Sequence, residues 1–429
     1  MNALANLRRD ALAIYHAALR AVAPEVVTRA ALARIEPGAG VWLVGLGKAA
    51  PAMTGAGLER LRDLGIEPLG GLVVTTADQV DRVQRLPATA GDHPVPGPAS
   101  LAAADGLEAL LTRVGERDEV WVFLSGGTSS LVAAPVDGLP ASDYRRLQDL
   151  LARAGLPIDE LNAVRKRFSR WGAGRLVSRL PARAIRVFAL SDVPGPIADI
   201  GSGPCEPDRW SAAELRRLLD ARRLWSRLPE GARAYLEQVI AGARPETPKP
   251  NDPSFARRST ILVADNATAV RAAGAAAREL GYRLVEDDTP LAGEAAKAGR
   301  RFAERLAALP GGPPAALIRG GETTVALGDD AGLGGRSQEL ALAAARLVRE
   351  LGRDAAVLAA GTDGRDGPTD AAGALVGPET WDRIRAAGVD PDRALRRHDA
   401  HPALDAANAL LRTGPTGTNV MDLAIGLVS

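Results

Sequence analysis

The sequence predicts an α/β fold with two domains that have largely parallel sheets. Three observations lead to this prediction. The chain has 429 residues, which is more than one hydrophobic core usually organises. Short apolar runs alternate along it with longer Ala-, Leu- and Arg-rich stretches of helical period, as strands and helices do in α/β folds. Most clusters of glycine and charged residues come directly after an apolar run, where ligands bind in open sheets.

Each apolar run predicts a strand, and a helix follows most of them. We expect strands at residues 41–45, 72–76, 120–125, 187–191, 260–264, 316–319, 323–327 and 356–360. We expect helices at residues 49–64, 99–114, 267–280, 291–309 and 337–351, with a short one from residue 129. Residues 1–22 have the spacing of an amphipathic helix and, with arginines among the apolar positions, do not resemble a signal peptide. The C-terminus reads as a turn-rich stretch followed by one more strand.

The boundary between the domains is predicted from proline content. Residues 241–254 contain four prolines and few apolar side chains, which is typical of a linker. We therefore expect an N-terminal domain at residues 1–243 and a smaller C-terminal domain at residues 255–429. The alternative is a long surface loop inside one domain. The final strand could also return to pack on the N-terminal domain.

Composition excludes several classes of protein. The formal net charge is +1, so no charge excess points to a nucleic-acid or membrane partner. No run of about 18 apolar residues suggests a membrane span. Cys205 is the only cysteine, which rules out an intrachain disulfide and fits a reducing cytoplasm.

The loop after the first strand, LVGLGKAAPAM, could hold a dinucleotide or a phosphate. Gly45 and Gly47 supply half of a dinucleotide fingerprint, but the acidic residue expected at the end of the second strand is absent, and Asp78 comes late for it. A glycine turn that leads into a helix, with Lys48 at its mouth, is a general anion site. Lys48 is one of only four lysines in an arginine-rich chain. The plainer alternative is a tight turn with a solvated lysine.

A second glycine loop follows the strand at residues 120–125. Its sequence is Ser125, Gly126, Gly127, Thr128 and Ser129. The glycines let backbone amides face a ligand, and the hydroxyls add donors, so we expect a cradle for a phosphate or carboxylate. A hydroxyl-rich helix cap is the alternative reading, and no nucleophile elbow is present.

Two further segments of the N-terminal half carry charge. Asp192 follows a strand and could bind Mg²⁺, accept a proton or cap a turn. In LNAVRKR, Asn162 shares a helix face with Lys166 and lies beside Arg165. One of these three could reach a ligand carboxylate, although such basic runs are usually solvated.

The C-terminal half repeats this pattern twice. In IRGGETTV and GGRSQEL, Glu322 follows a strand, and Arg336 precedes a helix, where its guanidinium would suit a phosphate group. Asp363 and Asp366 lie in one glycine-rich loop, and clustered carboxylates attract divalent cations, although turn-forming aspartates look the same. The four histidines, including His93 in a loop, form no recognisable zinc site or catalytic triad.

Taken together, these motifs resemble a known family. They are GLGKAAPAM, LSGGTSSL, LNAVRKR, LSDVPG with IGSGP, IRGGETTV, GGRSQELAL, AGTDGRDGPTDAAGA and TGTNVMDL. In this order they resemble the ATP-dependent glycerate 2-kinases with a C-terminal MOFRL domain, which also carry the older label hydroxypyruvate reductase. The resemblance runs from residue 8 to the C-terminus. It departs at GDHPVPG around His93, where GHPVPD would be expected, and at the proline-rich PGPIA after Asp192.

The resemblance implies a function and a set of roles. It implies a Rossmann-like first domain, an active site in the cleft between the domains, and ATP and Mg²⁺ as phosphoryl donor and cofactor. The product would be 2-phosphoglycerate, from transfer of the γ-phosphoryl group to the 2-hydroxyl of D-glycerate. Lys48 and Arg336 would be the catalytic cations, and Asp192 a base or metal ligand. The remaining candidates are Gly45, Gly47, Ser125–Ser129, Glu322 and Asp363 for the nucleotide, Asn162, Arg165 and Lys166 for glycerate, and Asp363 and Asp366 for the metal.

Two other functions are weighed against the kinase. An NAD(P)-dependent hydroxypyruvate reductase would need a ribose-binding acid, for which only Asp78 is available. A non-catalytic sugar-phosphate-binding protein is suggested by the loop at residues 125–130. The oligomeric state stays open, with a homodimer among the forms considered.

Overall fold

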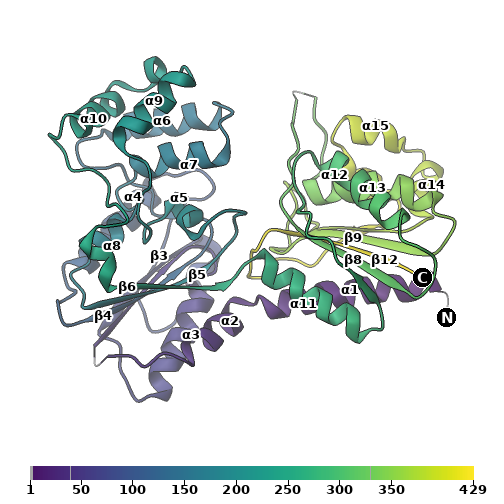
Figure 1. Cartoon of the computed structure of the whole chain (residues 1–429), viewed down its shortest axis with the longest axis horizontal. Coiled ribbons are helices and arrows are strands. Elements are labelled where there is room, and N and C mark those ends of the chain that lie inside the picture. Colours follow the sequence, from purple (N-terminus) through teal and green to yellow (C-terminus); the bar gives the residue numbers. More distant parts are fainter. Residues whose placement is uncertain (1–2, 39, 329) are drawn as a thin grey trace. The chain divides into compact units, whose positions relative to one another are not determined.

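The computed structural model describes residues 3–38, 40–328 and 330–429, and the chain divides into two compact units. Unit N is Val27–Val263, and unit C combines Met1–Val26 with Ala264–Ser429. Figure 1 shows that each unit contains its own sheet with helices on its faces. The α/β class predicted from the sequence is therefore confirmed.

Unit N is built on a six-stranded sheet in the order β3-β2-β1-β4-β5-β6. Its strands are β1 (Val41–Leu46), β2 (Gly70–Thr75), β3 (Ala88–Ala90), β4 (Glu119–Leu124), β5 (Ala184–Leu190) and β6 (Arg258–Ala264). The pairs from β3 through β5 are parallel, as predicted. In the register, Leu46 lies opposite both Val74 and Leu124. The carboxyl ends of β1, β2 and β4 therefore meet at one edge of the sheet.

The helices of unit N form two groups. Those near the sheet are α3 (Ala50–Asp63), α4 (Pro98–Leu111), α5 (Thr128–Leu131) and α8 (Arg175–Arg179), with the 3₁₀ turns η1 (Ala77–Arg82), η2 (Ile197–Ser202) and η4 (Pro253–Arg257). A separate helical layer has its own buried core, which includes Leu147, Phe168 and Leu236. It consists of α6 (Ala141–Ala152), α7 (Ile158–Arg167), α9 (Ala212–Ala221), η3 (Trp225–Arg227) and α10 (Glu230–Ile240). Helix α2 (Pro24–Leu32) crosses the boundary between the units.

Unit C is built on a mixed sheet in the order β11-β10-β9-β12-β8-β7. Its strands are β7 (Arg283–Val285), β8 (Ala315–Gly321), β9 (Ala355–Gly361), β10 (Gly373–Val376), β11 (Leu410–Leu411) and β12 (Asp422–Val428). β12 lies between β8 and β9 and is antiparallel to both. β10 is also antiparallel to its neighbours. The expectation of a largely parallel sheet is thus wrong for this unit, because the last strand inserts between β8 and β9 and runs antiparallel to both.

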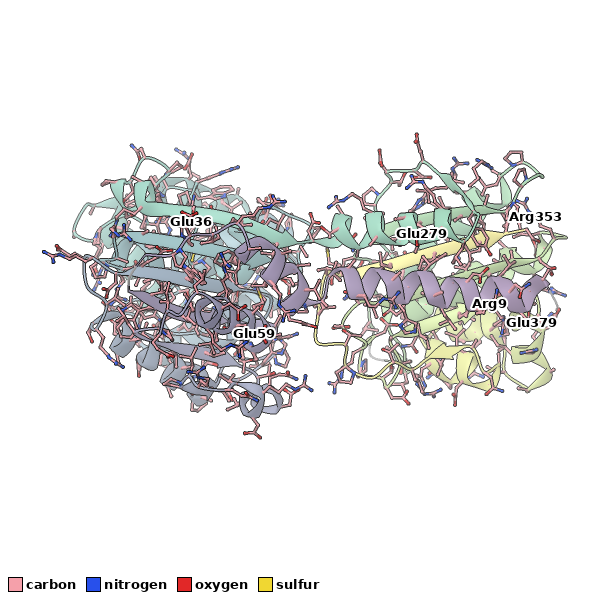
Figure 2. All side chains as sticks on the ribbon, turned by 90° about the horizontal axis from the view of Figure 1, so that it is seen from below. Arg9, Glu36, Glu59, Glu279, Arg353 and Glu379 are labelled. Carbon is pink, nitrogen blue, oxygen red and sulfur yellow. The ribbon has the colours of Figure 1, made fainter. Side chains whose placement is uncertain are left out.

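Helices cover both faces of this sheet (Figure 1). They are α1 (Ala3–Ala21) and α11 (Asn266–Glu279) on one face, and α12 (Ala295–Ala307), α13 (Arg336–Glu350), α14 (Thr380–Ala386), α15 (Pro391–Arg396) and α16 (Ala400–Ala406) on the other. Figure 2 shows α1 running along α11, with Arg9 and Glu279 labelled on them. The Tyr15 hydroxyl donates to Gly361 O at 2.7 Å, and the Tyr282 hydroxyl donates to Asp10 at 2.9 Å. These buried contacts hold the N-terminal helix in unit C.

The units differ from the predicted domains in three places. The N-terminal helix belongs with the C-terminal residues, since its apolar face and Tyr15 are buried there. The predicted linker at residues 241–254 lies inside unit N, where Thr247 donates to buried Asp208 at 2.9 Å. β6 (Arg258–Ala264), which falls in the predicted C-terminal domain, is an edge strand of the unit N sheet. The final strand lies in unit C, inside the predicted C-terminal domain, and pairs with β8 and β9. The strand predicted at residues 323–327 forms only an isolated bridge at Thr324.

The helices that the structure describes include none with the length and apolar character needed to cross a bilayer.

Candidate functional site

Two glycine loops of unit N lie against each other at the carboxyl edge of the sheet. After β1 the chain turns at Gly47, whose φ is +120°. The amide of Lys48 donates to Gly126 O at 3.0 Å, and the amide of Ala49 donates to the Ser125 hydroxyl at 3.1 Å. A Cβ on Gly47 would lie 2.5 Å from the Ser125 carbonyl oxygen, so only glycine allows this approach. The adjacent parallel strands β1 and β4 therefore bring the two predicted loops together.

Asp192 joins these loops from β5, the next strand of the sheet. A Cβ on Gly126 would lie 1.7 Å from Asp192 Oδ2, so the carboxylate packs directly on the glycine backbone. Asp192 is half-buried. The Ser191 hydroxyl accepts from the amide of Val193 at 3.4 Å and donates to its carbonyl at 3.1 Å, which fixes the turn after the strand. The structure therefore places Asp192 beside the two glycine loops.

The Lys48 side chain lies over Gly127, together with the ring of His93. A Cβ on Gly127 would lie 3.2 Å from Lys48 Cγ and 3.4 Å from His93 Cδ2. Partial burial and the nearby Lys48 charge lower the pKa of His93 to about 4. The Ser130 hydroxyl donates to Pro94 O at 2.8 Å and ties this loop to α5. His93 is therefore a neutral ring beside the lysine at neutral pH, a feature that sequence reading left without a role.

The hydroxyl groups of Thr128 and Ser129, which follow Gly127, form internal contacts that fix the conformation of the loop. Thr128 is fully buried and donates to Ser125 O at 2.8 Å. The hydroxyls of Ser129 and Ser202 lie 2.8 Å apart. A Cβ on Gly201 would lie 2.6 Å from Thr128 Cβ, so η2 packs closely on α5. These contacts support the loop, while the exposed parts of Gly127 and Ser129 stay at its surface.

The three candidates on α7 lie in a different environment. Asn162 and Lys166 are 7% and 6% exposed. Lys166 Nζ lies 3.3 Å from Asp208, which also pairs with buried Arg167 at 3.2 Å. Burial lowers the pKa of Arg165, against the opposing effect of Tyr144. The structure thus gives Lys166 a fixed internal partner, where the sequence predicted a ligand contact.

Unit C places Arg336 at the first turn of α13 between two carboxylates. Its Nε donates to Asp422 Oδ2 at 2.6 Å and its Nη2 donates to Oδ1 at 3.1 Å. Its Nη1 lies 2.8 Å from Glu322 Oε1. Burial alone would lower the pKa of Arg336, but Asp422 and Glu322 outweigh it and raise that pKa. The structure thus brings the two candidates Arg336 and Glu322 together and adds Asp422, a residue with no predicted role.

The loop after β9 separates its two predicted metal ligands. Asp366 is buried, and its two oxygens accept the amides of Ser337 at 3.1 Å and Gln338 at 2.7 Å. This caps the N-terminus of α13, so the metal-ligand role predicted for Asp366 is replaced by a structural one. Asp363 is half-buried, and its Oδ1 accepts the amide of Arg365 at 3.0 Å.

Each unit has one half-buried carboxylate among the predicted metal ligands, Asp192 in unit N and Asp363 in unit C. Among the residues that the structure describes, no three His, Cys, Asp or Glu side chains gather into a metal cluster. Mg²⁺ commonly uses one or two protein carboxylates together with substrate phosphates. Asp192 or Asp363 could supply one such carboxylate, with the other ligands coming from substrate phosphates and water.

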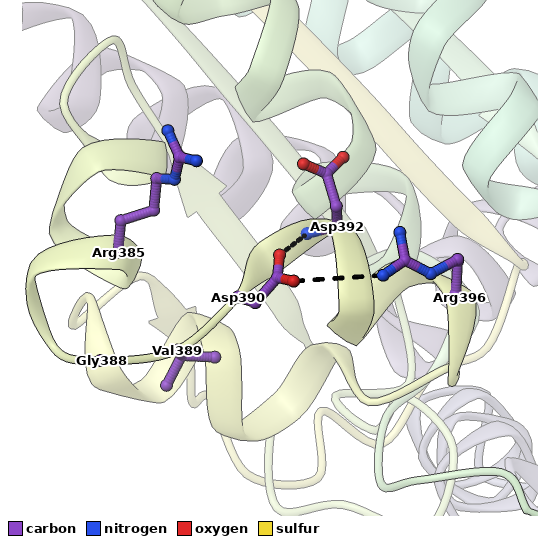
Figure 3. Close-up of a pocket in the computed structure, with 6 residues that line it drawn as sticks. All are labelled: Arg385, Gly388, Val389, Asp390, Asp392 and Arg396. Carbon is purple, nitrogen blue, oxygen red and sulfur yellow. Dashed lines mark hydrogen bonds and ion pairs between the residues drawn. The ribbon is translucent and has the colours of Figure 1, made fainter.

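An open pocket lies elsewhere in unit C, where α14 leads into α15 (Figure 3). It is lined by Arg385, Gly388, Val389, Asp390, Asp392 and Arg396. Asp390 accepts the amide of Asp392 at 3.0 Å and lies 4.0 Å from Arg396. Both contacts of Asp390 lie within this turn, and none of the predicted site residues lines the pocket.

The fold and site define an α/β protein with two glycine loops packed together at the carboxyl edge of a parallel sheet. The strand order of unit N is also that of dinucleotide-binding folds. However, β2 ends at Thr75, and Asp78 lies beyond it in η1, on the surface. The lysine-bearing loop and the absent ribose acid favour phosphate over a dinucleotide.

Comparison with known proteins agrees with this class. A domain of unknown function, DUF4147, matches residues 10–237, and the MOFRL family matches residues 315–422. A glycerate 2-kinase of Pyrococcus horikoshii is 35% identical, over 91% of this chain and 87% of the relative. The chain belongs to the glycerate kinase family with DUF4147 and MOFRL domains.

The similarity extends to three-dimensional structure. The crystal structure of a glycerate kinase from Thermotoga maritima has a TM-score of 0.86 and 33% identity, covering 99% of this chain and all of that one. A relative from Agrobacterium vitis, 37% identical over 90% of this chain and 86% of its own, bears a provisional hydroxypyruvate reductase name. Both names of the family predicted from the motifs thus occur among its relatives.

Proposed function

We propose that this protein is a glycerate 2-kinase, which transfers the γ-phosphoryl group of ATP to the 2-hydroxyl of D-glycerate and releases 2-phosphoglycerate and ADP. The observation that carries the proposal is the convergence of Lys48, the loop Ser125–Gly127 and Asp192 at one edge of the unit N sheet. Phosphoryl transfer depends mainly on positioning and on neutralising charge. A lysine, a glycine loop and a carboxylate are suited to these tasks. The kinase names of the relatives support the same reaction.

In this proposal the groups of unit N handle the transferred phosphoryl group and the attacking hydroxyl. The charge of Lys48 stabilises oxygens that become more negative in the transition state. The amides and hydroxyls of the loop at residues 125–129 orient the phosphate or the glycerate carboxylate. Asp192 accepts the proton of the 2-hydroxyl or takes part in holding the cation.

Unit C contributes a second cation and a second carboxylate. Arg336 is held by Asp422 and contacts phosphate oxygens through its remaining N–H groups, a role for which a planar guanidinium is suited. Asp363 and Glu322 are the candidates beside the nucleotide and its metal. When bound, Mg²⁺ supplies neutralising charge to the phosphates. Turnover is therefore expected to require residues of both units.

The test is a coupled assay with purified protein, ATP, Mg²⁺ and D-glycerate. Pyruvate kinase consumes ADP as well as phosphoenolpyruvate, so a couple that ends in pyruvate kinase and lactate dehydrogenase does not report 2-phosphoglycerate alone. The phosphoenolpyruvate that enolase forms from 2-phosphoglycerate is therefore followed directly by its absorbance. Signal with enolase alone supports phosphorylation at the 2-position. Signal that requires added phosphoglycerate mutase assigns the 3-position and contradicts the proposed substrate orientation.

The reductase function is tested beside it, because the strand order of unit N is the one that dinucleotides also use. The protein is mixed with NADH or NADPH and hydroxypyruvate in the absence of ATP. Steady consumption of the reduced nucleotide, with no ATP-dependent product from glycerate, would replace the kinase proposal.

A further inference from the structure

In unit C, the carboxylate of Asp422 is the group that holds the candidate cation Arg336. It is 4% exposed and binds Arg336 through two parallel hydrogen bonds, from Nε at 2.6 Å and from Nη2 at 3.1 Å. Such a bidentate pair fixes the plane of the guanidinium as well as its position. A single charge contact would leave that plane free to turn.

The register of the sheet explains why Asp422 reaches Arg336. Asp422 is the first residue of β12 and lies opposite Gly321 at the end of β8 and Gly361 at the end of β9. Neither neighbour has a side chain, and a Cβ on Gly361 would lie 3.4 Å from Asp422 Oδ1. The same two strands lead directly into Glu322 and the loop of Asp363. The buried carboxylate therefore stands at the centre of the unit C candidates.

The rest of the guanidinium is partly exposed. Arg336 has five N–H groups, and Asp422 engages one on Nε and one on Nη2. The Nη1 end lies beside Glu322, and both of these side chains are 36% exposed. Asp422 thus holds one edge of the guanidinium and Glu322 engages its Nη1 end, which leaves one N–H on Nη1 and one on Nη2 for phosphate oxygens.

We propose that Asp422 is the positioning residue that fixes the guanidinium plane of Arg336 for contact with the transferred phosphoryl group. This inference rests on the proposed kinase function. Asp422 acts through Arg336 and touches no reacting atom. Losing it should misdirect the arginine while leaving the positive charge in place.

A double-mutant cycle on turnover tests the inference. Asp422→Asn keeps the size of the side chain but puts an NH₂ group against an arginine donor, and we expect kcat to fall about 10- to 100-fold, as for other residues that orient a functional group. In an Arg336→Ala background the same change should cause no further loss, because its effect depends on the arginine. Equal losses in both backgrounds would overturn the proposal.

A matched control separates positioning from stability. Asp287 binds Arg319 of β8 at 2.6 Å, and both side chains are nearly buried, at 8% and 9% exposure. Asp287→Asn therefore breaks a comparable pair in the same unit without touching Arg336. It should lower the melting temperature but leave kcat near the native value. If it lowers kcat as much as Asp422→Asn does, the effect is one of stability and the proposal fails.

Two further measurements test the role of Asp422, one through the geometry of the guanidinium and one without any assay of activity. Arg336→Lys keeps the charge without the planar fork, and if the plane matters it should lose nearly as much turnover as Arg336→Ala. The Nε–H resonance of Arg336, assigned by its loss in Arg336→Lys, should exchange slowly in the native protein and rapidly in Asp422→Asn. This NMR result does not depend on activity, so it tests Asp422 even if the kinase assay is negative. Unchanged exchange in Asp422→Asn would reject the positioning role.

Discussion

Gly126→Ala is the sharpest test of the unit N site, because one methyl group is directed at one carboxylate. The new Cβ would lie 1.7 Å from Asp192 Oδ2 and 2.2 Å from its Cγ. That separation is roughly half of a normal nonbonded contact. The nearest atoms belong to the end of a side chain, so Asp192 can turn aside without moving the sheet.

The magnitude follows from this displacement. To restore contact distance the carboxylate must move by about 1.5 Å or more, and a misplacement of about 1 Å at a reacting centre can cost about 10²-fold in rate. We therefore expect kcat to fall by about 10²-fold. Turning the side chain costs about 0.5–1.5 kcal/mol, and replacing glycine returns about 0.4–1 kcal/mol through the unfolded state. The free energy of unfolding should therefore change little.

The assay is the coupled measurement of kcat and KM, with urea unfolding beside it. Gly55→Ala is the matched control, since a Cβ there meets nothing within 4 Å and the residue lies within α3. It should keep native activity and gain about 0.5–1 kcal/mol of stability. In an Asp192→Ala background, Gly126→Ala should cause little additional loss. Native turnover in Gly126→Ala would refute the reasoning and remove Asp192 from the mechanism.

Three other predictions concern the cations, the metal and pH. Lys48→Ala and Arg336→Ala should each lower kcat by about 10³-fold or more with the melting temperature kept; near-native turnover in either one would exclude that residue from phosphoryl transfer. Excess EDTA should abolish activity and added Mg²⁺ restore it, whereas activity that survives the chelator would contradict a metal-dependent reaction. Burial raises the pKa of Asp366 from 3.8 to about 6, so the folded state keeps its proton where the unfolded state has lost it, and stability should fall as pH rises from 4 to about 6, by up to about 3 kcal/mol. Urea unfolding should show this slope in the native protein and a smaller one in Asp366→Asn, and equal slopes would contradict the assignment.

Much of the local structure could be predicted because its apolar residues form clear runs in the strands and a regular helical spacing in the helices. The strand expected at residues 41–45 is β1, Val41–Leu46, and the helix expected at residues 337–351 is α13, Arg336–Glu350. The loops that follow β1, β4 and β5 could also be placed at one edge, since parallel strands end together. Short strands such as β7 and β11 carry too few residues for any period to be recognised.

The roles of individual carboxylates could not be predicted in the same way. Asp363 and Asp366 stand in one glycine loop and look equivalent in the sequence. In the folded chain Asp366 accepts hydrogen bonds from the amides of Ser337 and Gln338, which belong to a helix nearly 30 residues earlier in the sequence. Lys166 shows the same limit, because its partner Asp208 follows it by more than one helix. Only tertiary packing separates a capping or paired side chain from one left for a ligand.

Asp422 shows a more general reason why part of the site could not be predicted from the sequence. Ligand residues are expected just after each apolar run, and this expectation holds where neighbouring strands are parallel. β12 runs against β8 and β9, so the edge where those two strands end is the edge where β12 begins. The residue that reaches Arg336 is therefore the one at the start of the strand. In a sheet of mixed direction, polar residues that open an antiparallel strand should be examined together with those that close its neighbours.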